Sequence, residues 1–169
     1  MIVIIKAIAT AVKVSPYILL GICTTESNLR NVINHNDGGS PSYGICQIKL
    51  NTAKMFNPRI TPKELMNPEL NAYYAARYIK HQMNRYNENI IKAIAAYNSG
   101  RVKYNKSGRI INYKYVRKVL THYDHYYRED NNRSRKSIRN NFISERLLRR
   151  ELQATKEVTY NSRVSSLSK

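Results

Sequence analysis

Apolar residues recur at helical spacing in several stretches of the chain, and most stretches begin at a recognisable capping signal. The dipeptide Ser15-Pro16 is typical of an N-cap followed by the first helical residue, which predicts a helix from Pro16 to about Arg30. Thr61 and Glu64 have the spacing of a capping box and predict a short helix after Thr61. Glycine and proline are scarce, with 6 and 5 residues, so a mainly helical fold is expected.

Three more helices are predicted further along the chain. One begins at Asn67-Pro68 and presents an apolar face that repeats every three or four residues. That face consists of Ala72, Ala75, Ala76, Ile79 and Met83. Another carries Ile91, Ile94 and Ala95 and ends near Asn98-Ser99-Gly100, and the last begins at about Asn112.

The segment from Asn34 to Ile48 is rich in Asn, Gly, Ser and Pro, which predicts a loop. A small hairpin around Tyr43 to Ile48 could close it.

The N-terminal apolar run is interrupted by Lys6 and Lys13, unlike the unbroken stretch of a signal peptide. We therefore interpret it as the first helix of the domain, with an atypical export signal as the alternative. No stretch reaches the roughly 18 to 20 apolar residues that a spanning helix needs, so no membrane span is predicted.

Composition changes near residue 128. Residues 1–127 hold 18 basic and 6 acidic side chains, whereas residues 128–169 hold 11 basic and 5 acidic ones and end in a Ser-rich sequence. We predict a folded domain over 1–127 and a basic polar tail over 128–169. Within the tail, apolar residues at helical spacing predict a helix from Phe142 to Val158, which could dock on a partner or on the domain itself.

The net charge of the chain is +18, which favours polyanionic partners such as nucleic acid, anionic lipid or the acidic polymers of a bacterial envelope. Basic residues interleave with tyrosines from Tyr104 to Tyr127, so a basic nucleic-acid-binding protein is one alternative. No helix-turn-helix, zinc or RNA-binding motif supports specific nucleic-acid recognition.

The two cysteines and four histidines lack the spacing of a metal site, so no metal and no cofactor are predicted. His122 and His125 are three residues apart, but no third ligand lies near them in the sequence.

The predicted domain has few acidic residues that could do acid/base chemistry. They are Glu26, Asp37, Glu64, Glu69, Glu88 and Asp124. Glu64 and Glu69 have helix-capping or helix-dipole explanations, and Asp37 lies in the turn sequence Asn36-Asp37-Gly38-Gly39. Glu26 differs because it lies near the end of an apolar helix, just before a polar loop, where partial burial would raise its pKa and keep it protonated. An ordinary surface glutamate in a last helical turn is the alternative.

Four motifs in this order resemble the soluble lytic transglycosylases, which share a lysozyme-like fold with goose-type lysozymes. The segment Glu26-Ser27-Asn28-Leu29-Arg30 resembles the first motif, and Gly44-Ile45-Cys46-Gln47-Ile48 resembles the second, usually Gly-Leu-Met-Gln-Ile. Ala96-Tyr97-Asn98-Ser99-Gly100 resembles the third, and Tyr115-Val116 resembles the fourth. Each motif is weak alone, but together they are specific over residues 10 to 120, with a resemblance to phage or mobile-element members.

The resemblance implies a peptidoglycan lytic transglycosylase that needs no cofactor. Glu26 would be its catalytic acid and base, cleaving the bond between N-acetylmuramic acid and N-acetylglucosamine and leaving a 1,6-anhydro ring. The implied substrate-binding residues are Ser42, Gln47, Tyr97, Asn98 and Tyr115. A hydrolytic muramidase on the same fold is the nearest alternative, because goose-type lysozymes are related.

Two departures from the family pattern concern residues 34 to 46. Ile45-Cys46 replaces the usual Leu-Met pair, a change within apolar character, and the loop from Asn34 to Ser42 is longer than in many members. Either Ser40 or Ser42 could fill the family's serine role. Cys23 and Cys46 would lie close together if both motifs line one cleft. We expect buried free thiols there, since Cys packs as a small apolar group, with a disulfide as the alternative.

The implied partner is the glycan strand of the bacterial cell wall, on the periplasmic or extracellular side. Positive charge would hold the enzyme on this acidic substrate. The tail could tether it to a virion or a secretion machine.

Overall fold

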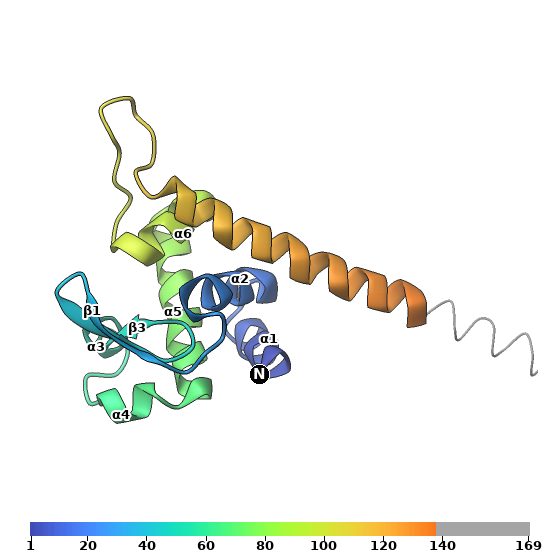
Figure 1. The fold of residues 1–169 in the computed structure, drawn as a ribbon, viewed down its shortest axis with the longest axis horizontal. Helices are drawn as coiled ribbons and strands as arrows, with labels where there is room; N and C mark the ends of the chain where they lie inside the picture. Colours follow the sequence, from blue (N-terminus) through green and yellow to red (C-terminus); the bar gives the residue numbers. More distant parts are fainter. Residues whose placement is uncertain (138–169) are drawn as a thin grey trace, which may run out of the picture. The chain divides into compact units, whose positions relative to one another are not determined.

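The computed structural model describes residues 1–137, and residues 1–127 form one compact unit. This unit is mainly helical, as predicted, with a small three-stranded sheet (Figure 1). Its elements are α1 (Ile2–Ala11), α2 (Pro16–Ser27), β1 (Ile33–Asp37), β2 (Ser40–Tyr43), β3 (Ile48–Lys49), α3 (Leu50–Lys54), α4 (Pro62–Leu65), α5 (Pro68–Arg85) and α6 (Ile90–Ser99). A further helix occupies 113–127 of this unit. Residues 128–137, which are also helical, belong to a second unit, and the helix predicted from Phe142 to Val158 lies outside the described residues.

The capping signals read from the sequence start the helices where they were expected. Ser15 is the N-cap of α2 with Pro16 at the first helical position, and Thr61 and Glu64 form a complete capping box on α4. The Asn67 side chain accepts the first free N–H groups of α5. The end of α2 was predicted too late, because Asn28 adopts a left-handed backbone (φ 55°) and ends the helix at Ser27.

The N-terminal apolar run forms α1, as predicted, and packs against α2 and α5. Ile5 and Ala9 of α1 are fully buried. The middle of α2, from Ile18 to Cys23, is apolar on every side and fully covered by its neighbours, and its polar last turn is partly buried. Gly21 allows the 113–127 helix to approach, because a Cβ there would lie 2.6 Å from the carbonyl oxygen of Val119. The core therefore wraps around the helix that carries Glu26.

The segment from Asn34 to Ile48 was predicted as a loop, and this prediction was wrong in part, for the residues before Tyr43. Strands β1 and β2 pair there as an antiparallel hairpin that turns at Gly38-Gly39, and Tyr43 pairs with Ile48 to add β3. The hairpin around Tyr43 to Ile48 was therefore expected correctly. Asn and Ser are poor strand formers, so their composition concealed a β1 strand that hydrogen-bonds along the edge of the sheet.

Asn71, fully buried on α5, fastens the loop between β2 and β3. Its Oδ1 accepts the backbone N–H of Cys46 at 2.8 Å, and its Nδ2 donates to the carbonyl oxygens of Tyr43 (2.7 Å) and Leu65 (2.9 Å). Gly44 makes room for this amide. It has a left-handed backbone (φ 77°), and a Cβ there would collide with the Asn71 side chain.

No helix among residues 1–137 is both long enough and apolar enough to cross a bilayer. The same residues contain no group of three or more His, Cys, Asp or Glu side chains arranged to hold a metal ion.

Replacing Gly44 with alanine should destabilise the fold by about 3 kcal/mol, since it adds left-handed strain and breaks the bonds of a buried amide. Gly108→Ala is the matched control, because Gly108 has a similar φ (73°) but open space around it. The control should lose only about 1 kcal/mol. Urea denaturation of both variants measures the difference, and equal losses would contradict the role given to Asn71.

Candidate active site

A cleft of about 520 Å³ lies between α2, the sheet and the end of α6. Five of the six residues singled out in the sequence line it, namely Glu26, Ser42, Gln47, Tyr97 and Asn98. The sixth, Tyr115, comes from the 113–127 helix and donates a hydrogen bond to Glu26. The fold thus brings together residues that are up to 89 positions apart in the chain.

Glu26 is a half-buried carboxyl in the last turn of α2. The hydroxyl of Tyr115 donates to its Oε1 at 2.6 Å, which lowers its pKa, but burial is the larger effect. Together with the negative charge of Asp37, burial raises the pKa of Glu26 to about 7. Because Oε1 already accepts the hydrogen bond from the Tyr115 hydroxyl, the acidic proton of Glu26 is assigned to Oε2.

Both tyrosines beside Glu26 remain protonated at neutral pH. Burial, reinforced by the charge of Glu26, raises the pKa of Tyr97 and of Tyr115 well above the ordinary value of 10. The Tyr97 hydroxyl donates to the carbonyl oxygen of Cys46 at 2.9 Å, which ties α6 to the loop before β3. Tyr97 therefore stabilises the wall of the cleft and also lines the cleft.

Gln47 has most of its hydrogen-bonding capacity engaged inside the protein. Its Nε2 donates to the carbonyl oxygens of Val32 (3.0 Å) and Gly44 (2.7 Å), and its Oε1 accepts from the hydroxyl of the buried Ser42 at 2.7 Å. Gln47 also has a left-handed backbone (φ 50°), which these bonds hold in place. What is left for a ligand is one lone pair of Oε1 and the Ser42 hydroxyl oxygen as an acceptor.

Asn98, at the end of α6, is exposed to the cleft. Its Oδ1 accepts from Nδ2 of Asn112 at 3.0 Å, and the same Asn112 nitrogen donates to the carbonyl oxygen of Ala95. Asn112 therefore orients the Asn98 amide so that its Nδ2 is available as a donor. A carbonyl oxygen of a ligand is the natural acceptor for that group.

The structure also places residues in the cleft that the sequence did not single out. Those with polar side chains outside the four motifs are Asn34, Asp37, Lys49, Thr52, Tyr78 and Lys103. Asp37 was read as a turn residue, but the β1–β2 hairpin carries it to the cleft, with its carboxylate 3.6 Å from Nζ of Lys49. Nothing local in the sequence marks Asn71 and Asn112 as the residues that hold this wall together.

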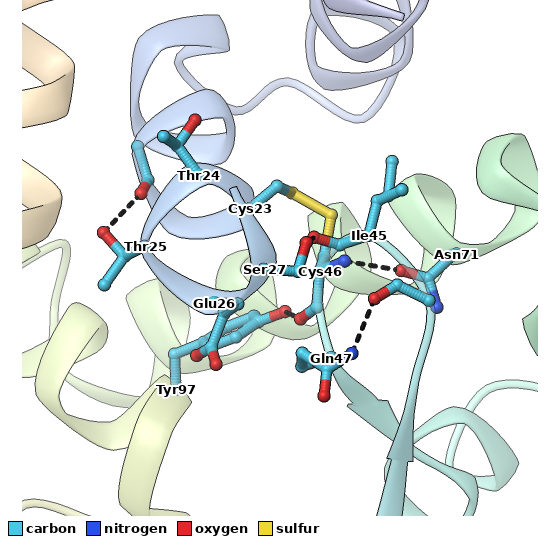
Figure 2. The surroundings of a disulfide bond; sticks show 12 residues. Cys23, Thr24, Thr25, Glu26, Ser27, Ile45, Cys46, Gln47, Asn71 and Tyr97 are labelled. Atoms are coloured by element: carbon cyan, nitrogen blue, oxygen red, sulfur yellow. Dashed lines mark hydrogen bonds between the residues drawn. A yellow bond between two sulfur atoms is a disulfide. The ribbon is translucent and has the colours of Figure 1, made fainter. Parts of the chain in front are cut away.

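Cys23 and Cys46 form a disulfide, so the expectation of buried free thiols was wrong. Figure 2 shows this bond between the helix of Glu26 and the loop of Gln47. Beside it, the Ser27 hydroxyl donates to the carbonyl oxygen of Ile45 at 2.7 Å and holds the same two segments together. Whether two sulfurs are within bonding reach depends on this packing, which sequence spacing does not give.

The family model for the transglycosylase SLT domain matches residues 3–118 of this chain. No curated protein is significantly similar to it in sequence.

Similar solved structures include the lytic transglycosylase Slt of Pseudomonas aeruginosa, as the inactive mutant E503Q (TM-score 0.61, 20% identity). The 70-kDa soluble lytic transglycosylase SLT70 of Escherichia coli is similar with a TM-score of 0.59 and 25% identity. A complex of the 70-kDa soluble lytic transglycosylase with bulgecin A has a TM-score of 0.57 and 24% identity. Each match covers 75% of this chain but only 24% of the other, so this chain spans about a quarter of their length.

The raised pKa of Glu26 predicts that its ionisation weakens the fold. The folded protein holds the Glu26 proton up to about pH 7, whereas the unfolded chain releases it near 4.5, so stability falls between these values as pH rises. Between pH 5 and pH 8 the free energy of unfolding of the unmutated protein should fall by about 2 kcal/mol more than that of Glu26→Gln. This figure allows for the solvent that reaches the carboxyl. Urea denaturation at pH 5 and pH 8 compares the two proteins, and parallel pH profiles would contradict the raised pKa.

Removing the disulfide with the double variant Cys23→Ala and Cys46→Ala should lower the free energy of unfolding by about 3 kcal/mol, given the 23-residue separation. Thiol titration of the air-oxidised, unfolded protein should find no reactive thiol before dithiothreitol and two afterwards. Two reactive thiols before reduction would show that the bond does not form.

Proposed function

The chain belongs to the transglycosylase SLT-domain family, and we propose on this premise that it is a peptidoglycan lytic transglycosylase. It would cleave the β-1,4 bond between N-acetylmuramic acid and N-acetylglucosamine and leave 1,6-anhydro ends. The observation that carries this proposal is Glu26, whose pKa of about 7 lets one carboxyl both give and take a proton near neutral pH.

Glu26 first acts as the acid. Its Oε2 proton passes to the glycosidic oxygen as the bond from that oxygen to C1 of the muramic sugar breaks, and positive charge develops at C1. The tyrosine at Oε1 stabilises the resulting carboxylate by a charge-assisted hydrogen bond. The carboxylate then removes the proton of the 6-hydroxyl while O6 bonds to C1. The reaction consumes no water and returns Glu26 to its protonated form.

The substrate-binding roles expected from the resemblance can be refined by the geometry. Nδ2 of Asn98 is suited to the acetamido carbonyl oxygen, because Asn112 already occupies the other end of the amide. The Ser42 hydroxyl oxygen and one lone pair of Gln47 Oε1 can still accept hydrogen bonds from a sugar. The bonds that these two residues make within the protein stabilise the wall on which the sugar would lie. We assign Tyr115 to the control of Glu26 and Tyr97 to the shape of the cleft.

The presence of a second carboxylate, Asp37, in the cleft makes hydrolysis a second candidate function. A second carboxylate in the cleft could activate a water molecule, as in the two-carboxylate hydrolases. Its pairing with Lys49 favours a structural role instead, since the ammonium already engages the carboxylate. The two functions differ in product, because hydrolysis leaves a reducing end.

The natural substrate would lie in the bacterial envelope, so we place the site of action at the cell wall. Attachment to a virion or a secretion machine through residues 128–169 stays a prediction.

Digestion of purified peptidoglycan, followed by mass spectrometry, should yield anhydro-muropeptides, each lighter by one water than the hydrolytic product. Glu26→Gln should lower the rate by about a thousandfold, because the amide cannot transfer the proton. Glu69→Gln, an exposed glutamate in the first turn of α5, is the matched control and should keep full activity.

Reducing-end products that disappear in Asp37→Asn would make the protein a muramidase. The absence of any glycan product from a folded protein on several wall types would overturn both functions.

A further inference from the structure

The segment after α6 carries an unusual excess of positive charge. Residues 100–112, between α6 and the 113–127 helix, contain four basic side chains and no acidic one. Among the described residues, Arg101, Lys103 and Arg109 have no ion-pair or side-chain hydrogen-bond partner. Their charge is therefore available to a ligand instead of being neutralised within the protein.

Backbone bonds give this segment a defined shape, and it extends away from the helices as a long loop (Figure 1). The N–H of Ile111 donates to the carbonyl oxygen of Lys103, and Tyr104 pairs with Ile110. At the tip, the Asn105 side chain accepts the backbone N–H of Arg109 at 2.9 Å. Backbone groups and the Asn105 side chain hold the turn, and the Arg109 side chain makes none of these bonds.

One side of the segment forms a second hollow of about 510 Å³. It is lined by Asn105, Arg109, Ile110, Ile111 and Tyr113, and we call it the apolar hollow. Ile111 and Tyr113 are 62% and 46% exposed, so their apolar surface is open to a ligand in this hollow. A guanidinium among apolar walls suits a ligand with small apolar groups and a carboxylate.

The segment is also continuous with the catalytic cleft. Gly100 and Lys103 line the cleft, while Arg109 lines the apolar hollow on the other arm of the same loop, which pairs with the arm of Lys103 through backbone bonds. A polymer that lies in the cleft can therefore reach the segment without leaving the protein surface.

We propose that residues 101–113 bind the peptide side chains of the glycan strand whose sugars occupy the cleft. This inference rests on the proposed function. Arg109 takes a peptide carboxylate in a bidentate contact, Ile111 and Tyr113 cover its alanine methyl groups, and Lys103 attracts a carboxylate nearer the cleft. The protein then distinguishes peptide-bearing strands from bare ones, which the sugar contacts alone would not do.

The test uses the full chain with Glu26→Gln, which holds substrate without turning it over. Binding is measured by co-sedimentation with insoluble glycan from one wall preparation, before and after an amidase has removed the peptides. Arg109→Gln in this background should weaken binding to the peptide-bearing glycan by about tenfold. Its effect on the peptide-free glycan should be several times smaller.

Two further variants separate recognition from general charge attraction. Lys106→Gln removes one charge from the same turn but lines neither the cleft nor the apolar hollow, so it should change binding less than twofold. Arg109→Lys keeps the charge without the planar fork and should recover only part of the affinity.

Equal losses on the two glycans, or an equal loss from Lys106→Gln, would overturn the inference. The proposed function fails independently, if the unmutated chain releases no product from either glycan. A dependence on Arg109 for peptide-bearing glycan would then still identify residues 101–113 as a binding surface.

Discussion

The side-chain amide of Asn71 is the interaction on which the cleft depends. Its bonds to Cys46, Tyr43 and Leu65 fix a loop that has no regular structure of its own. A buried amide with all these partners is stabilising, whereas the loss of any one leaves a backbone group unsatisfied in the core. The disulfide, the Tyr97 hydrogen bond and the position of Gln47 all follow from where this amide holds Cys46.

Glu26 shows how two opposing effects set the chemistry of the site. Burial favours the protonated carboxyl, and the Tyr115 hydroxyl favours the charged one. Burial wins by enough to bring the pKa to about 7, and the hydrogen bond limits the rise. An acid that is half protonated near neutral pH can serve in both directions, which a single-carboxyl mechanism requires.

The polar groups of the site differ in how many of their hydrogen bonds are made inside the protein. Ser42, Gln47 and Tyr97 use most of their polar groups in hydrogen bonds within the protein. These residues therefore contribute more to the shape of the cleft than to direct ligand binding. By contrast, Asn98 keeps its Nδ2 free, and Lys103 keeps its ammonium free, where the chain leaves α6 along the cleft.

Much of the helical frame can be read from local signals in the sequence, because capping and apolar periodicity act within a few residues. The resemblance of the four motifs to a known family also predicted one site for Glu26, Ser42, Gln47, Tyr97, Asn98 and Tyr115. The tertiary structure alone decided the β1–β2 hairpin, the disulfide, the place of Asp37 in the cleft and the bracing by Asn71 and Asn112. These features depend on contacts between residues far apart in the chain. Such a contact produces no capping signal or periodic pattern in the sequence around either partner, so it cannot be predicted from local sequence.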